Sequence, residues 1–247
     1  MSVNATPKLA VVIPTLNEAG NIPVLLDRLS AAIANAPVDC EFIIVDDGST
    51  DGTADVARAC AAHDPRVRVF VRNGERGLAG AVIHGWAQTD ATFLAVIDAD
   101  LQHPPELLPE LLFRVLNGSD IAIASRYVSG NGNSLGEWNK FRIFVSRCST
   151  LLATAPLRGR GLNVKDPLSG YFVVRRDCIE ALRLQPEGFK ILLEILVKGR
   201  IRNATEVPFH FATRQSGKSK ADFKVALHYF TLLGKLSRYA FFGQGQQ

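Results

Sequence analysis

Two acidic side chains, Asp98 and Asp100, follow an apolar run at 93–97 and are separated by one small residue. Side chains alternate along an extended chain, so carboxylates at positions i and i+2 point to the same side. Two such anions repel each other unless a cation lies between them. A hard cation such as Mg²⁺ or Mn²⁺ accepts one or two carboxylates and fills its other positions with water and phosphate oxygens. The pair therefore indicates a metal site that neutralises a diphosphate.

A purely structural role for the same residues is the alternative, because aspartates often form turns at strand ends and the HPP that follows could begin a helix. The neighbouring Gln102 and His103 favour the metal site, since they add neutral polar groups to an open, oxygen-rich segment. The five histidines show no zinc-binding spacing. We expect them to be structural, with the role of His103 left open.

Strands that alternate with helices surround this segment and predict βαβ units with a mostly parallel sheet, an α/β fold. The expected strands cover 9–16, 41–53 (with its closing polar turn), 67–72 and 93–100, and the expected helices cover 21–36, 54–62 and 77–88. Further strands are expected at 120–125 and 172–174. Ligands bind at the carboxyl ends of such strands.

Polar residues gather where three of these strands end. They are Asn17 and Glu18 after the first strand, Asp46 and Asp47 after the second, and Asp98 and Asp100 after the fourth. We expect these three tails to form one site. Within the second tail, Asp51 and Thr53 are expected to be structural turn residues, whereas Asp47 could accept a hydrogen bond from a nucleotide base or ribose.

Several other classes of protein are disfavoured by missing motifs. The chain has no GxxxxGK[ST] phosphate loop and no GxGxxG after its first strand. The four cysteines, Cys40, Cys60, Cys148 and Cys178, include no CxxC pair, so we expect reduced thiols of a cytosolic protein. No secretory leader and no run of about 20 apolar residues is found.

Charge is unevenly distributed along the 247 residues, whose formal net charge is +4. Acidic residues exceed basic ones in 1–100, whereas basic residues are in excess in 126–165 and 198–247. This pattern indicates a metal site that faces an anionic substrate or surface, with ordinary solvated faces as the alternative. The segment 225–243 is interrupted by charges and is expected to form an amphipathic, interfacial helix.

Eight motifs stand here in the order found in family 2 glycosyltransferases, and the chain most resembles the dolichol- or polyprenol-phosphate mannosyltransferases. They are IPTLNE, VDDGSTDGT, RGLAGAVIHG, DADLQHPPE, SRY, DPLSGYF, GFKILLE and RQSGKSK. The resemblance implies a GT-A fold, a metal-dependent reaction with Mg²⁺ or Mn²⁺, a nucleotide-sugar donor, a polyprenyl-phosphate acceptor and inversion at the sugar carbon.

The resemblance also implies roles for particular residues. Those that would contact the nucleotide sugar are Pro14, Leu16, Glu18, Val45, Asp47, Asp98, Ala99, Asp100, Leu101, His103, Arg126, Arg214 and Lys220. The metal ligands would be Asp98, Asp100 and Gln102, and the acceptor phosphate would meet Arg126, Arg142, Ser146 and Asp166. Asp98, Asp100, Arg126, Arg214 and Lys220 would carry the catalysis. Asp166 either orients the acceptor arginines, which we favour, or caps a turn.

The expected reaction is transfer of mannose from GDP-mannose to a polyprenyl phosphate at the cytoplasmic face of a membrane. Leu16 stands where many relatives have tyrosine, so a UDP-sugar such as UDP-glucose is an alternative donor. A non-catalytic nucleotide-sugar-binding module and an NAD-dependent enzyme are the alternatives from other classes. We expect one domain over 1–247, with a donor half at 1–125, an acceptor half and lid loop at 126–224 and a membrane-proximal helix at 225–247. A transmembrane partner is kept as an alternative, and no nucleic-acid partner is expected.

Overall fold

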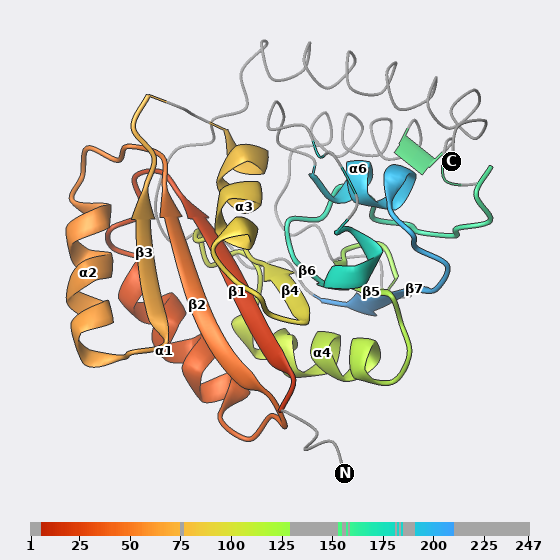
Figure 1. Cartoon of the computed structure of the whole chain (residues 1–247), viewed down its shortest axis with the longest axis horizontal. Coiled ribbons are helices and arrows are strands. Elements are labelled where there is room, and N and C mark those ends of the chain that lie inside the picture. The colour runs from red at the N-terminus through yellow and green to blue at the C-terminus, as the bar shows by residue number, and fades with distance from the viewer. Residues whose placement is uncertain are drawn as a thin grey trace.

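A seven-stranded sheet lies between two layers of helices in the computed structural model (Figure 1). The structure describes residues 6–74, 77–128, 159–180 and 191–209, together with residues 153, 154, 157, 182 and 184. The strands are β1 (Lys8–Thr15), β2 (Asp39–Asp46), β3 (Val67–Val71), β4 (Phe93–Val96), β5 (Ile121–Ser125), β6 (Phe172–Arg175) and β7 (Ala204–Pro208). The helices are α1 (Ile22–Ile33), α2 (Thr53–His63), α3 (Leu78–Ala87), α4 (Leu108–Leu116) and α6 (Ile191–Lys198), and η1 (Pro105–Leu107) and η2 (Arg176–Cys178) are short 3-10 turns.

The strand order is β3-β2-β1-β4-β6-β5-β7, and β6 alone among these strands runs antiparallel to its neighbours. The chain moves from β1 to β2 and β3 on one side, then crosses to place β4 on the other side of β1. The crevice beyond the carboxyl ends of β1 and β4 is therefore a topological switch point, where open α/β sheets bind ligands. The fold therefore predicts a ligand site at the segments that follow these two strands.

Alternation along β1 explains why helices cover both faces of the sheet. Ala10 and Val12 pack into a core with α3 and α6, whereas Leu9, Val11 and Ile13 pack into a second core with α1 and α4. All five residues are fully buried. A parallel strand covered on both faces must be apolar on both faces, which accounts for the continuous apolar run that predicts it.

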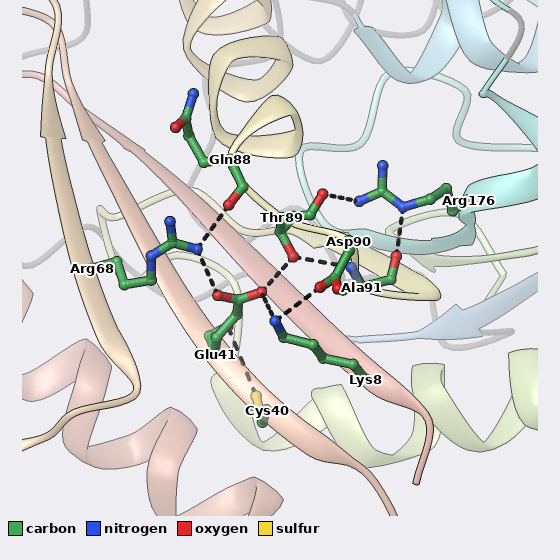
Figure 2. Close-up of polar contacts among 9 residues, drawn as sticks. All are labelled: Lys8, Cys40, Glu41, Arg68, Gln88, Thr89, Asp90, Ala91 and Arg176. Carbon is green, nitrogen blue, oxygen red and sulfur yellow. Dashed lines mark hydrogen bonds and ion pairs between the residues drawn. The ribbon is translucent and has the colours of Figure 1, made fainter. Parts of the chain in front are cut away.

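Buried Glu41 ties the sheet together at the amino-terminal ends of the strands (Figure 2). Its carboxylate lies 3.0 Å from Lys8 Nζ on β1, accepts a 2.9 Å hydrogen bond from Arg68 on β3 and accepts another from the Thr89 hydroxyl. Burial opposes the charge, yet these three donors outweigh it and lower the pKa of Glu41. The cluster joins three strands to the segment that leads into β4, at the opposite end of the sheet from the switch point.

The structure confirms the predicted α/β class and the parallel arrangement of the first four strands. One prediction is wrong in extent, since β4 ends at Val96 and does not continue to residue 100. The Ile97 amide still donates to the Val12 carbonyl at 3.2 Å, but the next donor from β1 would be Pro14, which has no N–H. The sequence analysis also gave no range for α4, α6 or β7.

Among the described residues, no helix has the length and hydropathy needed to cross a membrane. The predicted amphipathic helix at 225–243 lies outside the described residues.

Candidate functional site

A tight turn after β4 carries the two predicted metal-binding carboxylates. Asp98, Asp100 and Gln102 are partly exposed, while the intervening Ala99 and Leu101 are buried. The expected alternation is therefore present, although it arises in a turn and not in a strand. Leu101 adopts a left-handed conformation with φ of 59°, and Asp100 Oδ1 accepts a 3.2 Å hydrogen bond from the Gln102 amide. The turn therefore leaves three oxygen-bearing side chains partly accessible to solvent.

Asp98 lies among groups from distant parts of the chain. Gly170, which directly precedes Tyr171 and β6, approaches it so closely that a Cβ on this glycine would lie 2.3 Å from Asp98 Oδ2. His103 Nδ1 is 3.9 Å from the same oxygen, too far for a hydrogen bond but close enough for electrostatic attraction when the ring is protonated. The predicted metal carboxylate of Asp98 is thus bounded by Gly170 and His103.

Arg126, directly after β5, is held by buried Asp166. Its backbone amide, Nε and Nη2 donate to the two Asp166 oxygens at 3.0, 2.8 and 2.7 Å. The Arg126 side chain is 12% exposed and that of Asp166 is fully buried. Burial opposes the guanidinium charge, but the hydrogen bonds and charge of Asp166, aided by the negative charge of Asp98, raise the pKa of Arg126. A permanent cation therefore lies within electrostatic range of the predicted metal carboxylate.

Glu206 on β7 fixes the segment that carries Asp166. Its carboxylate accepts hydrogen bonds of 2.9 Å from the backbone amides of Lys165 and Asp166. The sequence offered no signal for this role, because Glu206 lies 40 residues away from Asp166. It meets the segment only because β7 pairs with β5 in the sheet.

The tails of β1 and β2 interlock beside the carboxylate turn. Asn17, with φ of 57°, accepts a 2.9 Å hydrogen bond from the Thr50 amide, and its own amide donates to Ser49 Oγ at 2.8 Å. The Glu18 amide donates to Thr53 Oγ1 at 2.9 Å. These bonds bring the first two polar tails together, as the sequence predicted.

Asp51 has the expected structural role in this loop pair. Its carboxylate accepts hydrogen bonds from the Thr53 amide at the start of α2 and from the Ala19 amide, both at 3.1 Å. Although burial works in the opposite direction, these donors and the Thr53 hydroxyl lower the pKa of Asp51.

The adjacent carboxylates Asp46 and Asp47 are both buried and both have protein partners. Asp46 accepts hydrogen bonds from Thr15 Oγ1 at 3.1 Å and from the Ser49 amide at 2.9 Å. Asp47 forms a bidentate pair with buried Arg72, with distances of 2.7 and 2.9 Å. The sequence analysis did not identify Arg72 as the partner of Asp47.

The remaining predicted donor-site residues sit at the same edge in different environments. Pro14 and Leu16 are partly exposed, whereas Val45 is fully buried in the core, so only its backbone could meet a ligand. Glu18 is partly exposed, and its carboxylate accepts a 2.7 Å hydrogen bond from Asn21. The predicted residues Arg142, Ser146, Arg214 and Lys220 lie outside the described residues.

The donor set fits a hard divalent cation. Asp98, Asp100 and Gln102 offer oxygen atoms, which Mg²⁺ and Mn²⁺ prefer. Within the described residues, no group of three or more His, Cys, Asp or Glu side chains could hold a metal. An ion at this turn would therefore take its other ligands from water and from phosphate oxygens of a substrate, the usual arrangement for Mg²⁺.

Comparisons with known proteins agree with this geometry. Residues 10–183 match the family described as Glycosyl transferase family 2. A dolichol-phosphate mannosyltransferase of Pyrococcus furiosus is 39% identical over 94% of this chain, which spans 64% of that protein's length. An undecaprenyl-phosphate mannosyltransferase of Micrococcus luteus is 34% identical over 86% of this chain and 87% of its own length.

A similar solved structure is glucosyl-3-phosphoglycerate synthase from Mycobacterium tuberculosis in complex with Mn²⁺, UDP and glucosyl-3-phosphoglycerate. It has a TM-score of 0.65 and is 22% identical to this chain, and the match covers 95% of this chain and 77% of the synthase chain. At this identity the likeness supports the fold and leaves the substrates open. With its family match, its switch-point site and its mostly parallel sheet, this chain belongs to glycosyl transferase family 2 and has the GT-A fold.

Proposed function

We propose that this chain transfers mannose from GDP-mannose to the phosphate of a polyprenyl lipid, with inversion at the sugar carbon. The names of the Pyrococcus and Micrococcus relatives support both the sugar and the acceptor class. The structural observation that carries the proposal is the pairing of a carboxylate turn with a fixed cation. Asp98 and Asp100 suit a metal on a diphosphate, while Arg126 lies within electrostatic range of Asp98 and suits a second phosphate.

The chemistry of a phosphate acceptor matches a site of this kind. A phosphate monoester is already an anion, so its oxygen forms the new bond to the anomeric carbon without a strong general base. The bond between that carbon and the donor diphosphate breaks, and the nucleoside diphosphate leaves with the electron pair. The protein must therefore align two phosphates and manage their charge, and it need not move a proton.

Arg126 is suited to the attacking phosphate, because a guanidinium presents paired N–H donors to phosphate oxygens. Asp166 holds Nε and Nη2, which fixes the plane of the guanidinium. On the donor side, Asp98, Asp100 and Gln102 would bind the divalent ion. When bound, that ion would neutralise the charge that develops on the leaving diphosphate.

The donor base would lie beside the tails of β1 and β2, with Pro14, Leu16, Glu18, Val45 and Asp47 around it. The Arg72 pair orients the Asp47 carboxylate at this position. We assign 1–125 to the donor half, 126–224 to the acceptor half with its lid, and 225–247 to a membrane-proximal helix. The basic excess of the last two segments would attract an anionic membrane surface at the cytoplasmic face.

A direct test offers radiolabelled GDP-mannose or UDP-glucose together with dolichyl or undecaprenyl phosphate in detergent, with Mn²⁺, Mg²⁺ or EDTA. The proposal expects label from GDP-mannose in the lipid fraction, lost on addition of EDTA. Label from UDP-glucose alone would replace mannose with glucose. No transfer from either donor by a folded protein that still binds nucleotide would point to a non-catalytic binding module.

A further inference from the structure

Gly170 lies directly beneath the carboxylate of Asp98, although the two residues are far apart in the sequence. A Cβ built on Gly170 would lie 2.3 Å from Oδ2, 2.9 Å from Cγ and 3.2 Å from Oδ1 of Asp98. All three atoms of the carboxylate are thus within the volume that any side chain at position 170 would need. The observed position of Asp98 depends on the absence of that side chain.

The backbone at Gly170 does not itself require glycine. Among the glycines that the structure describes, those with positive φ are Gly48, Gly52, Gly74, Gly77, Gly118 and Gly161, and Gly170 is not one of them. An alanine could adopt its backbone conformation without strain. The need for glycine at position 170 therefore comes from the carboxylate above it.

The backbone around Gly170 is tied down, so it cannot easily retreat from a larger side chain. The Tyr171 carbonyl accepts a 2.9 Å hydrogen bond from the Ala124 amide of β5, and the Tyr171 amide donates to Ser169 Oγ at 3.2 Å. The Tyr171 hydroxyl donates to the Pro105 carbonyl at 3.3 Å. An added methyl group would therefore displace the Asp98 side chain more readily than the main chain.

A buried ring bounds Asp98 on another side. His103, only 4% exposed, packs between Tyr171 and Phe209, with ring centroids 5.8 and 5.2 Å away. Its Nδ1 lies 3.9 Å from the same Oδ2 that faces Gly170. Because His103 is packed in this way, it limits the alternatives open to a displaced carboxylate.

We propose that Gly170 is a positioning residue of the metal site. Because it has no side chain, it leaves the space in which the Asp98 carboxylate lies when it binds the divalent ion. The same turn also carries Asp166, which holds Arg126. One short segment, 166–170, thus sets the metal carboxylate and the acceptor cation relative to each other. The inference rests on the proposed metal-dependent function. It implies that this turn sets the distance between the donor diphosphate and the acceptor phosphate.

The first measurement is Mn²⁺ affinity, by calorimetry or by the paramagnetic resonance of free Mn²⁺, in the intact chain without substrate. Loss of the groups that orient metal ligands weakens metal binding about 10- to 100-fold, and Gly170→Ala is expected to fall in this range. Gly20→Ala is the matched control, since its Cβ would meet nothing within 4 Å and its φ is not positive. It should bind Mn²⁺ as the wild type does.

The second measurement separates positioning from a general packing defect. Melting temperatures in EDTA are compared for the wild type, Gly170→Ala, Asp98→Ala and the double variant. Gly170→Ala should lower the melting temperature by about 2–4 °C or more, and Asp98→Ala should remove most of that loss, because the clashing carboxylate is gone. If Gly170→Ala alone fails to fold, recovery in the double variant is the expected result.

The outcomes distinguish this inference from the proposed function. Wild-type Mn²⁺ affinity in Gly170→Ala, or an equal loss of melting temperature with and without Asp98, overturns the inference and leaves the proposed function standing. No Mn²⁺ binding by the wild-type chain, even with nucleotide present, overturns the metal site itself. In that case Gly170 would be a packing partner of Asp98 and no more.

Discussion

Replacing Asp166 with asparagine tests the link between the buried ion pair and the acceptor phosphate. The carboxylate accepts three hydrogen bonds from Arg126, two of them from the guanidinium. Asparagine keeps the size of the side chain but removes its charge and turns one acceptor into a donor. The largely buried guanidinium would then have lost its anionic partner.

The expected effect is large because both side chains are sheltered from water. Breaking a buried pair by removing one partner costs about 3–5 kcal/mol, since an uncompensated charge remains. Two charge-assisted hydrogen bonds, each worth about 1.5–3 kcal/mol, give about 3–6 kcal/mol, which overlaps this range. The exposed pair between Arg175 and Asp177 is the matched control, and Asp177→Asn should cost less than about 1 kcal/mol.

The assays are urea unfolding and steady-state kinetics with separate variation of donor and lipid. In Asp166→Asn, we expect the KM for the polyprenyl phosphate to rise about 10- to 100-fold, which corresponds to a loss of about 1.4–2.8 kcal/mol of binding. The KM for the nucleotide sugar should change much less. A stability loss no larger than that of Asp177→Asn, or an equal rise in both KM values, would refute the reasoning.

Three further predictions concern the metal turn, acid stability and thiol reactivity. Asp100→Asn should weaken metal-dependent nucleotide binding at least about tenfold in calorimetry, whereas Glu110→Gln, at a side chain that is 42% exposed, should not, and equal effects would contradict the role of Asp100. The lowered pKa of Glu41 means that its contribution is complete above its ordinary pKa of 4.5 and is lost as the pH falls through the folded-state pKa. Glu41→Gln should therefore be about 1–3 kcal/mol less stable at pH 7. The difference in urea midpoints should shrink as the pH falls below 4.5; a constant difference would exclude the carboxylate as its source. Burial raises the pKa of Cys40 to about 12, so peptide mapping should find it unalkylated by iodoacetamide at pH 8 until the chain is unfolded, and rapid labelling of native protein would disprove this.

Much of the fold follows from local patterns. Short apolar runs ending in polar turns predicted the first and third strands to within one residue at each end and the start of the second strand to within two, because strands covered on both faces are apolar throughout. The fourth strand was predicted too long, since the point where β4 ends depends on its hydrogen bonds with β1. Pro14 on β1 offers no amide to Ile97, a fact that emerges only when the two strands are paired.

The candidate site, like the fold, was predicted from the sequence only in part. The sequence by itself determined which carboxylates would gather at one sheet edge, since parallel strands bring their carboxyl ends together whatever the intervening helices do. Only the tertiary structure decided what each carboxylate would meet. Arg72 reaches Asp47, and Gly170 makes room for Asp98, through contacts between segments distant in the chain. Such pairings depend on strand order and packing, which local sequence patterns do not encode, whereas strand ends and turn residues depend on near neighbours, which they do.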